Sequence, residues 1–154
     1  MNGAAKALAP VSVRSVLAQA RFFSGGTPAQ LERVTALARV RRFPQDTRIY
    51  NLGDNADDFF VLADGMVRFT LGLGKRETSA GEIIRRGEVF GWAALIESAH
   101  TRIATAFCIT PCEVIALDGK ELIALMDSDN GLGYALMKQL SVLLTSELTS
   151  FAAG

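Results

Sequence analysis

Short strand-like runs separated by turn residues fill the chain from residue 40 to residue 117. The runs are rich in β-branched and aromatic residues, and they end at proline, glycine or aspartate. The pair Asp64-Gly65, between "DFFVLA" and "MVRFTLGL", is typical of a β-hairpin turn. So many closely spaced short strands predict an antiparallel sandwich, jelly roll or barrel. Tight turns between such strands need positive φ or close backbone approach, and we expect them at the glycines 53, 65, 81, 87 and 91.

A helical pattern precedes this β region. Residues 13–20 have apolar side chains at helical spacing, and after a glycine pair comes "TPAQLERVTAL". Thr27 is the expected N-cap of this second helix, Pro28 suits its first position, and Gln30 completes a capping box. The apolar face of the second helix is formed by Leu31, Val34 and Leu37.

Two further helices are expected after the β region. Asp118 is placed to cap "GKELIALMD", residues 127–130 form a break, and "GLGYALMKQLSVLLTSELTSF" then predicts a long amphipathic helix. Its apolar stripe suggests either a helix packed on its own domain or the seam of a homodimer, because one small domain does not easily cover so broad a stripe. The stripe consists of Leu136, Met137, Leu140, Leu143, Leu144, Leu148 and Phe151.

The order of these patterns predicts an α+β, mainly β protein: an antiparallel β-roll or jelly roll flanked by N-terminal helices and a long C-terminal helix. A chain of 154 residues suits a single domain. We expect a flexible start at 1–12, N-terminal helices at 13–39, the β-roll at 40–117 and C-terminal helices at 118–152.

Composition argues against nucleic-acid binding and against a metal centre. Sixteen basic residues balance sixteen acidic ones, so no overall field attracts nucleic acid. Cys108 and Cys112 lack the further ligands that a zinc or iron–sulfur site needs, and His100 is the only histidine. We therefore expect structural cysteines, no metal and no resident cofactor.

Catalysis and membrane insertion are also not expected. No cluster of histidine, cysteine or acidic residues has catalytic spacing, and the aspartates at 54, 57 and 58 are typical of a solvated turn. Lys6, Pro10 and Arg14 interrupt the apolar residues at the N-terminus, and no stretch reaches the roughly 18 apolar residues of a membrane span. We expect a cytoplasmic protein that is not an enzyme.

Two motifs that span the segment 88–105 carry a family resemblance. "GEVFGWAAL" and then "TRIATA" follow the glycine-marked strands and precede two helices. They resemble the phosphate-binding cassette of cyclic nucleotide-binding domains of the catabolite-activator type, usually written Phe-Gly-Glu-x-Ala-Leu and then Pro-Arg-x-Ala-Thr or Ser. The likeness extends over residues 13–152 and implies the jelly roll and a regulatory, ligand-sensing role. The matching cassette residues are Phe90, Gly91, Ala94, Leu95, Arg102, Ala104 and Thr105.

The chemistry of such a cassette follows from its residues. A cyclic phosphate carries one negative charge, which arginine and backbone N–H groups at a helix start hold well. Arg102 is the matching cation, and the small residues of "GWAAL" leave backbone amides accessible. The ligand-binding residues that we expect are Phe90, Gly91, Trp92, Ala93, Ala94, Arg102, Ile103, Ala104 and Thr105.

The sequence departs from the family pattern at the ribose end. Trp92 stands where the family has a glutamate that accepts a hydrogen bond from the ribose 2′-hydroxyl, and indole has no acceptor. Such a loss typically costs about 1–3 kcal/mol, so the resemblance implies that ordinary cAMP binding is weakened. Thr101 replaces the usual proline, and Ile103 stands where a small or hydroxyl residue is frequent in the family. Glu147 and Leu148 occupy the positions of the family's purine-contacting polar residues.

Two functions are consistent with this pattern. The first is a regulatory domain that binds an anionic, cyclic nucleotide-like ligand and signals through its last helix, as a homodimer. The second is a degenerate, ligand-free domain that serves in dimerisation or protein interaction, its pocket filled by Trp92. Family transcription factors have a helix-turn-helix domain after the long helix, and because this sequence shows none we expect no DNA binding by this chain.

Overall fold

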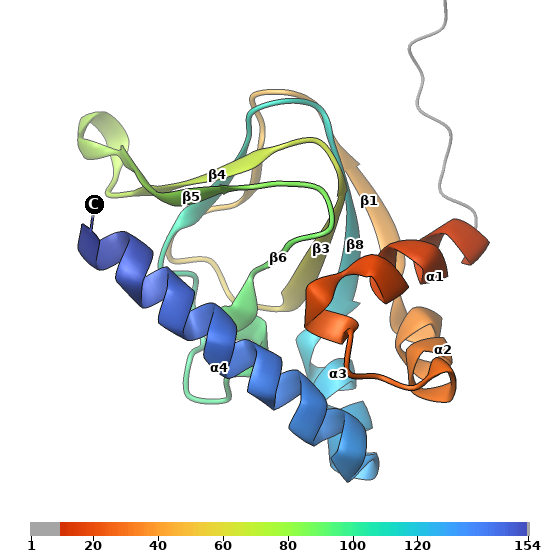
Figure 1. The fold of residues 1–154 in the computed structure, drawn as a ribbon. Coiled ribbons are helices and arrows are strands. Elements are labelled where there is room, and N and C mark those ends of the chain that lie inside the picture. The colour runs from red at the N-terminus through yellow and green to blue at the C-terminus, as the bar shows by residue number, and fades with distance from the viewer. Residues whose placement is uncertain (1–9, 154) are drawn as a thin grey trace, which may run out of the picture.

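The computed structural model describes the backbone of residues 10–153 and the side chains of residues 13–149. Eight strands form two four-stranded antiparallel sheets, and the helices gather on one side of them (Figure 1). The mainly β jelly roll with flanking helices that the sequence predicts is thus confirmed. One sheet has the order β1 (Arg39–Phe43), β8 (Cys112–Asp118), β3 (Asp58–Asp64), β6 (Val89–Phe90); the other has the order β2 (Arg48–Tyr50), β7 (Thr105–Cys108), β4 (Val67–Leu71), β5 (Thr78–Ile84).

The turn at Asp64-Gly65 is not a hairpin, so this prediction is wrong. β3 pairs with β8 and β6, whereas β4 pairs with β7 and β5, and the chain therefore passes from one sheet to the other at this turn. Gly65 has a φ of 100°, and a Cβ there would lie 2.5 Å from the Pro111 carbonyl oxygen. The Met66 amide donates to Thr110 Oγ1 at 3.0 Å, so the β3–β4 and β7–β8 connections cross between the sheets together.

All five glycines that we assigned to turns have positive φ. Gly81, however, lies inside β5 and not between two strands. It falls where the pairing of β5 with β4 shifts register, between Ala80 and Ile84. The turn expected at Gly81 is in fact a β-bulge within β5. A bulge, like a tight turn, can require a residue with positive φ, which explains the glycine.

The N-terminal helices are α1 (Pro10–Gln19) and α2 (Pro28–Leu37), with the short 3₁₀ helix η1 (Arg21–Phe23) between them. The predicted capping box of α2 is confirmed. Thr27 Oγ1 accepts from the Gln30 amide at 3.2 Å, and Gln30 Oε1 accepts from the Thr27 amide at 2.9 Å. α1 begins at Pro10, three residues before the expected start, and residues 1–9 of the segment expected to be flexible lie outside the described residues.

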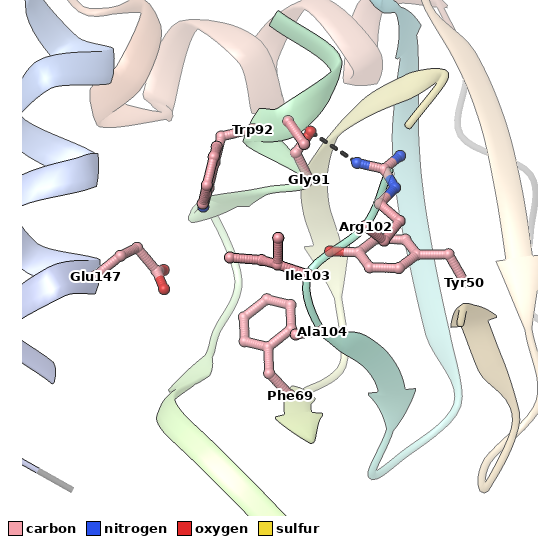
Figure 2. A pocket seen from close by; sticks show the side chains of 9 residues that line it. Tyr50, Phe69, Gly91, Trp92, Arg102, Ile103, Ala104 and Glu147 are labelled. Atoms are coloured by element: carbon pink, nitrogen blue, oxygen red, sulfur yellow. Dashed lines mark hydrogen bonds between the residues drawn. The ribbon is translucent and has the colours of Figure 1, made fainter. Parts of the chain in front are cut away.

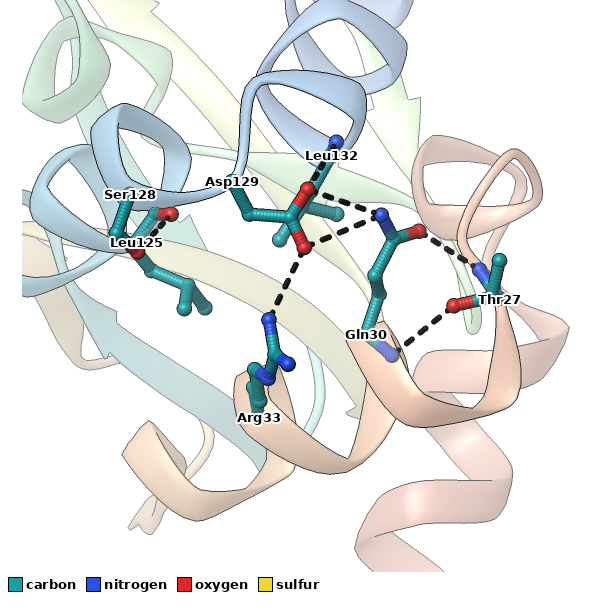
Figure 3. Close-up of polar contacts among 7 residues, drawn as sticks. All are labelled: Thr27, Gln30, Arg33, Leu125, Ser128, Asp129 and Leu132. Atoms are coloured by element: carbon teal, nitrogen blue, oxygen red, sulfur yellow. Dashed lines mark hydrogen bonds and ion pairs between the residues drawn. The ribbon is translucent and has the colours of Figure 1, made fainter.

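The C-terminal helices are α3 (Gly119–Ser128) and α4 (Asn130–Ala153), and the predicted Asp118 cap of α3 is present. Asp129, at their junction, accepts from Gln30 Nε2 at 3.2 Å and from Arg33 Nη1 at 3.1 Å (Figure 3). The Leu132 amide, and then these two side chains, hold the pKa of Asp129 below its usual value. This network ties the start of α4 to α2.

The buried apolar residues form two clusters on the two faces of β3. Residues alternate along a strand, so Phe59 and Val61 face the helices while Phe60 and Leu62 face the other sheet. β3 is therefore buried on both sides, which explains its unbroken apolar sequence. The helix-side cluster also contains Leu17, Phe23, Val34, Leu117, Leu122 and Leu136, and the inter-sheet cluster also contains Val67, Phe69, Phe90, Cys108, Cys112 and Val114.

The apolar stripe of α4 is divided between two faces. Leu136 and Leu140 are buried against the domain, so α4 packs on its own chain. Met137 and Leu148, in contrast, are 40% and 72% exposed. The side chain of Phe151 lies outside the described residues. None of the helices within residues 10–153 is both long and apolar enough to cross a bilayer.

Candidate functional site

A small cavity lies where the second sheet, the cassette loop and α4 meet (Figure 2). Its volume is about 30 Å³, room for a single water, whereas small-molecule sites typically measure about 300–1,000 Å³. A ligand of nucleotide size therefore requires its walls to move. The cavity is lined by Tyr50, Phe69, Gly91, Trp92, Ala93, Arg102, Ile103, Ala104 and Glu147.

Arg102 is held at the cavity by its backbone and by its guanidinium. The Arg102 amide donates to the Asp54 carbonyl, and the Arg102 carbonyl accepts from the Gly53 amide, each at 2.8 Å. At the other end of the side chain, Nη1 donates to the Gly91 carbonyl at 3.0 Å and Nη2 to the Asp58 carbonyl at 2.6 Å. The aspartate-rich turn thus positions the cation of the cassette.

The charge of Arg102 is not neutralised by a direct ion pair within the described residues. Its side chain partners are two carbonyls and the ring of Tyr50, 4.1 Å from the guanidinium carbon, while the Asp58 carboxylate pairs with Arg39 at 2.7 Å. Arg102 is only 4% exposed, and its Nε has no hydrogen-bond partner in the described part of the chain. Burial lowers the pKa of Arg102, but a guanidinium remains charged at neutral pH.

Gly91 ends β6 and precedes the 3₁₀ helix η3 (Trp92–Leu95). Its φ is 79°, and a Cβ there would lie 2.9 Å from Cδ2 of Phe60 and 3.1 Å from the Asp58 carbonyl oxygen. Only glycine both adopts this positive φ without strain and leaves room for Phe60 and the Asp58 carbonyl. The Ala94 amide donates to the Gly91 carbonyl at 3.2 Å, so this amide is engaged within the turn.

Trp92 forms the wall between the cassette and α4, where its ring also packs against the helix-side core (Figure 2). Glu147 faces the same cavity from α4, and Ile103 also lines it. Burial, and then the neighbouring Glu82, raise the pKa of Glu147. The cavity thus has a cation on the β-roll and a carboxyl group on the helix.

Comparison with known proteins identifies the family to which this chain belongs. Residues 40–129, more than half of the chain, match the family model described as the cyclic nucleotide-binding domain. The chain belongs to the cyclic nucleotide-binding domain family. The cyclic AMP receptor protein of Thermus thermophilus is 29% identical over 106 residues, which are 68% of this chain and 48% of that protein. The chain therefore spans about half the length of this curated relative.

Solved structures share the fold of this cyclic nucleotide-binding domain. The sensor domain of the transcriptional regulator DNR from Pseudomonas aeruginosa superposes with a TM-score of 0.75 at 19% identity, covering 91% of this chain and 93% of that one. The regulatory domain of Toxoplasma gondii PKA with cAMP gives a TM-score of 0.72 at 22% identity, covering 86% and 49%.

The domain brings six of the nine expected site residues to the cavity: Gly91, Trp92, Ala93, Arg102, Ile103 and Ala104. The other three do not line it. Phe90 is stacked on Phe60 in the inter-sheet core, with ring centroids 5.0 Å apart. Ala94 packs against Gly119 at the start of α3, and Thr105 Oγ1 accepts from the Leu52 amide at 2.9 Å.

Three lining residues lie outside the expected set: Tyr50 on β2, Phe69 on β4, and Glu147 on α4, which the family resemblance placed at a purine-contacting position. Tyr50 and Phe69 both precede the cassette in the sequence, and only the pairing of β2, β7 and β4 brings them to it. Their aromatic character in strand-like runs was the available signal, but it does not tell which face of which sheet they occupy.

Proposed function

We propose that this domain is a regulatory sensor which binds an anionic, cyclic nucleotide-like ligand at the Arg102 cavity. The observation that carries the proposal is the state of Arg102: its cation is 4% exposed and is held by neutral partners, and its Nε has no hydrogen-bond partner among the described residues. A buried charge without a counter-ion is costly, and an oxyanion in the cavity would supply one. The cAMP complex of the Toxoplasma gondii relative supports a cyclic nucleotide as the ligand class.

Ligand binding is proposed to act on α4. The cavity is too small for a nucleotide, and Glu147 of α4 is one of its walls, so an entering ligand displaces either Trp92 or the helix. The far face of α4 exposes Met137 and Leu148, and we propose that it pairs with a second copy of the chain. Movement of α4 would then change the geometry of the dimer.

The intrinsic fluorescence of Trp92 tests this proposal, since it is the only tryptophan and lies on the cavity wall. Titration with cAMP, cGMP and cyclic dinucleotides is expected to give a saturable change in emission with at least one of them. A flat signal with every nucleotide, together with an unchanged melting temperature, would contradict the sensor role.

The volume of about 30 Å³ favours a second candidate, a degenerate domain that binds no ligand and serves in dimerisation. Trp92 and Ile103 would then fill the former ligand space permanently. Loss of stability on removing Arg102 does not separate the two functions, because Arg102 bonds two carbonyls in either case. A nucleotide that copurifies with the protein, identified by mass spectrometry after denaturation, would exclude the degenerate domain.

A further inference from the structure

Tyr50, at the end of β2, reaches the cavity through an irregularity in its strand. Along a regular strand, successive side chains point to opposite faces. The pairing of β2 with β7 shifts register between Arg48 and Tyr50, so that consecutive Ile49 and Tyr50 both contact the inter-sheet core. Bulges of this kind re-aim a side chain and are common beside functional sites.

The ring of Tyr50 is fixed by its neighbours. One neighbour is the Phe60 ring, stacked at a centroid distance of 6.0 Å and an interplanar angle of 24°. The other is the Arg102 guanidinium, 4.1 Å from the Tyr50 ring centroid. The buried Arg102 guanidinium therefore makes a cation–π contact with the Tyr50 ring.

The hydroxyl end of Tyr50 points into the cavity (Figure 2). The Arg102 side chain beside it donates hydrogen bonds to two carbonyls. No hydrogen bond among the described residues involves the Tyr50 hydroxyl. Burial raises the pKa of the Tyr50 phenol, with Arg102 opposing and Glu147 adding to the rise. The hydroxyl thus stays protonated and can donate.

We propose that Tyr50 is a further ligand-binding residue, whose hydroxyl donates a hydrogen bond to an oxyanion of the ligand beside Arg102. The inference deepens the proposed function and rests on it. Arg102 has two nitrogens committed to carbonyls, so a neighbouring neutral donor completes the contacts that an oxyanion needs. Glu147 on the opposite wall repels an oxyanion and directs it to the Tyr50–Arg102 side.

The substitution Tyr50→Phe tests this role, because it removes the hydroxyl and keeps the ring. Calorimetric titration with cAMP and with cGMP is expected to show binding about 10- to 100-fold weaker than wild type, as for a lost hydrogen bond to a charged group. The melting temperature should stay close to that of wild type. Tyr134→Phe is the matched control: it removes the other tyrosine hydroxyl, on a side chain 69% exposed on α4, and should leave binding unchanged.

Adenosine, which has the ribose hydroxyls but no phosphate, shows whether the Tyr50 hydroxyl contacts the phosphate or the nucleoside. Tyr50→Phe should not change the affinity for adenosine, and an equal loss for adenosine and cAMP would overturn the oxyanion assignment. Wild-type affinity of Tyr50→Phe for both cyclic nucleotides would overturn the role of Tyr50 and leave the sensor function standing. Absence of binding of cAMP, cGMP and cyclic dinucleotides alike to the wild-type chain would contradict the proposed function and, with it, this inference.

Discussion

The carbonyl oxygen of Gly91 accepts a hydrogen bond of 3.0 Å from Nη1 of Arg102. This contact joins the two motifs of the cassette, which are separated in the sequence by the loop after η3. A Cβ at Gly91 would lie 3.2 Å from the same Nη1, so the glycine is needed both for the left-handed turn and for the approach of the cation.

Gly91→Ala is expected to destabilise the domain and displace Arg102. The φ of 79° alone costs a non-glycine residue roughly 1–2 kcal/mol, and the close contacts with Phe60 and Asp58 add about 1–3 kcal/mol. Chemical denaturation measures the loss. Gly53→Ala is the control, because Gly53 has a φ of 90° with no atom within 4 Å of a built Cβ. Equal losses in the two variants would show that the packing around Gly91 does not matter.

Glu147→Gln is expected to raise the melting temperature at neutral pH. The pKa of Glu147 is raised in the folded state by burial and by Glu82, so the unfolded chain releases this proton first and stability falls as the pH rises through the range above the usual value. Glutamine does not ionise, so the variant does not lose stability in this way as the pH rises. Its advantage over wild type should therefore be present at pH 7 and disappear near pH 4, where the carboxyl group is largely protonated in both states.

Thermal melts of Glu147→Gln and wild type across this pH range show whether the variant has the higher melting temperature at pH 7. Glu97→Gln, which replaces an exposed glutamate outside the cavity, is the control and should show no such pH-dependent gain. A destabilised Glu147→Gln at pH 7 would mean that the carboxylate is stabilised by a partner in the folded state.

If the proposed dimer forms, Leu148→Glu is expected to convert it into a folded monomer, and the melting temperature should fall only by the part that dimerisation contributes. Leu148 is 72% exposed on α4, so a charge there enters solvent in the monomer but an apolar seam in the dimer. Light scattering after gel filtration gives the mass. Leu73→Glu is a matched control, since Leu73 is 71% exposed but lies on the β4–β5 connection. A monomeric wild type, or a dimeric Leu148→Glu, would contradict the proposed seam.

Local signals predicted the helices and most strands, but not the path between the sheets. The capping box at Thr27 and the cap at Asp118 depend on residues three positions away, and both are present. The turn at Asp64-Gly65 also has a clear local signal, yet its two strands pair with strands from distant parts of the chain, β3 with β8 and β4 with β7. Strand pairing is decided by such long-range contacts, which a turn motif does not contain.

The cassette was predictable because its residues are consecutive, whereas the opposite walls were not. Gly91 and Arg102 could be placed from the motif, and the structure brings them together at the cavity. Tyr50 faces the cavity only because β2 departs from regular alternation, and no residue pattern in "TRIYN" indicates that irregularity. The burial of Arg102 was likewise not readable from the sequence, which allowed a surface position.

The role of Arg102 in ligand binding is tested by calorimetric titration of wild type and Arg102→Gln with cAMP, cGMP and cyclic dinucleotides. We expect saturable binding of at least one nucleotide to wild type, weakened at least about 30-fold in the variant, because an oxyanion in the cavity loses its only buried cation among the lining residues. Circular dichroism at the titration temperature verifies that the variant is folded. Equal affinities of the two proteins, or no binding of any of these nucleotides to wild type, would contradict the claim that Arg102 holds a ligand here.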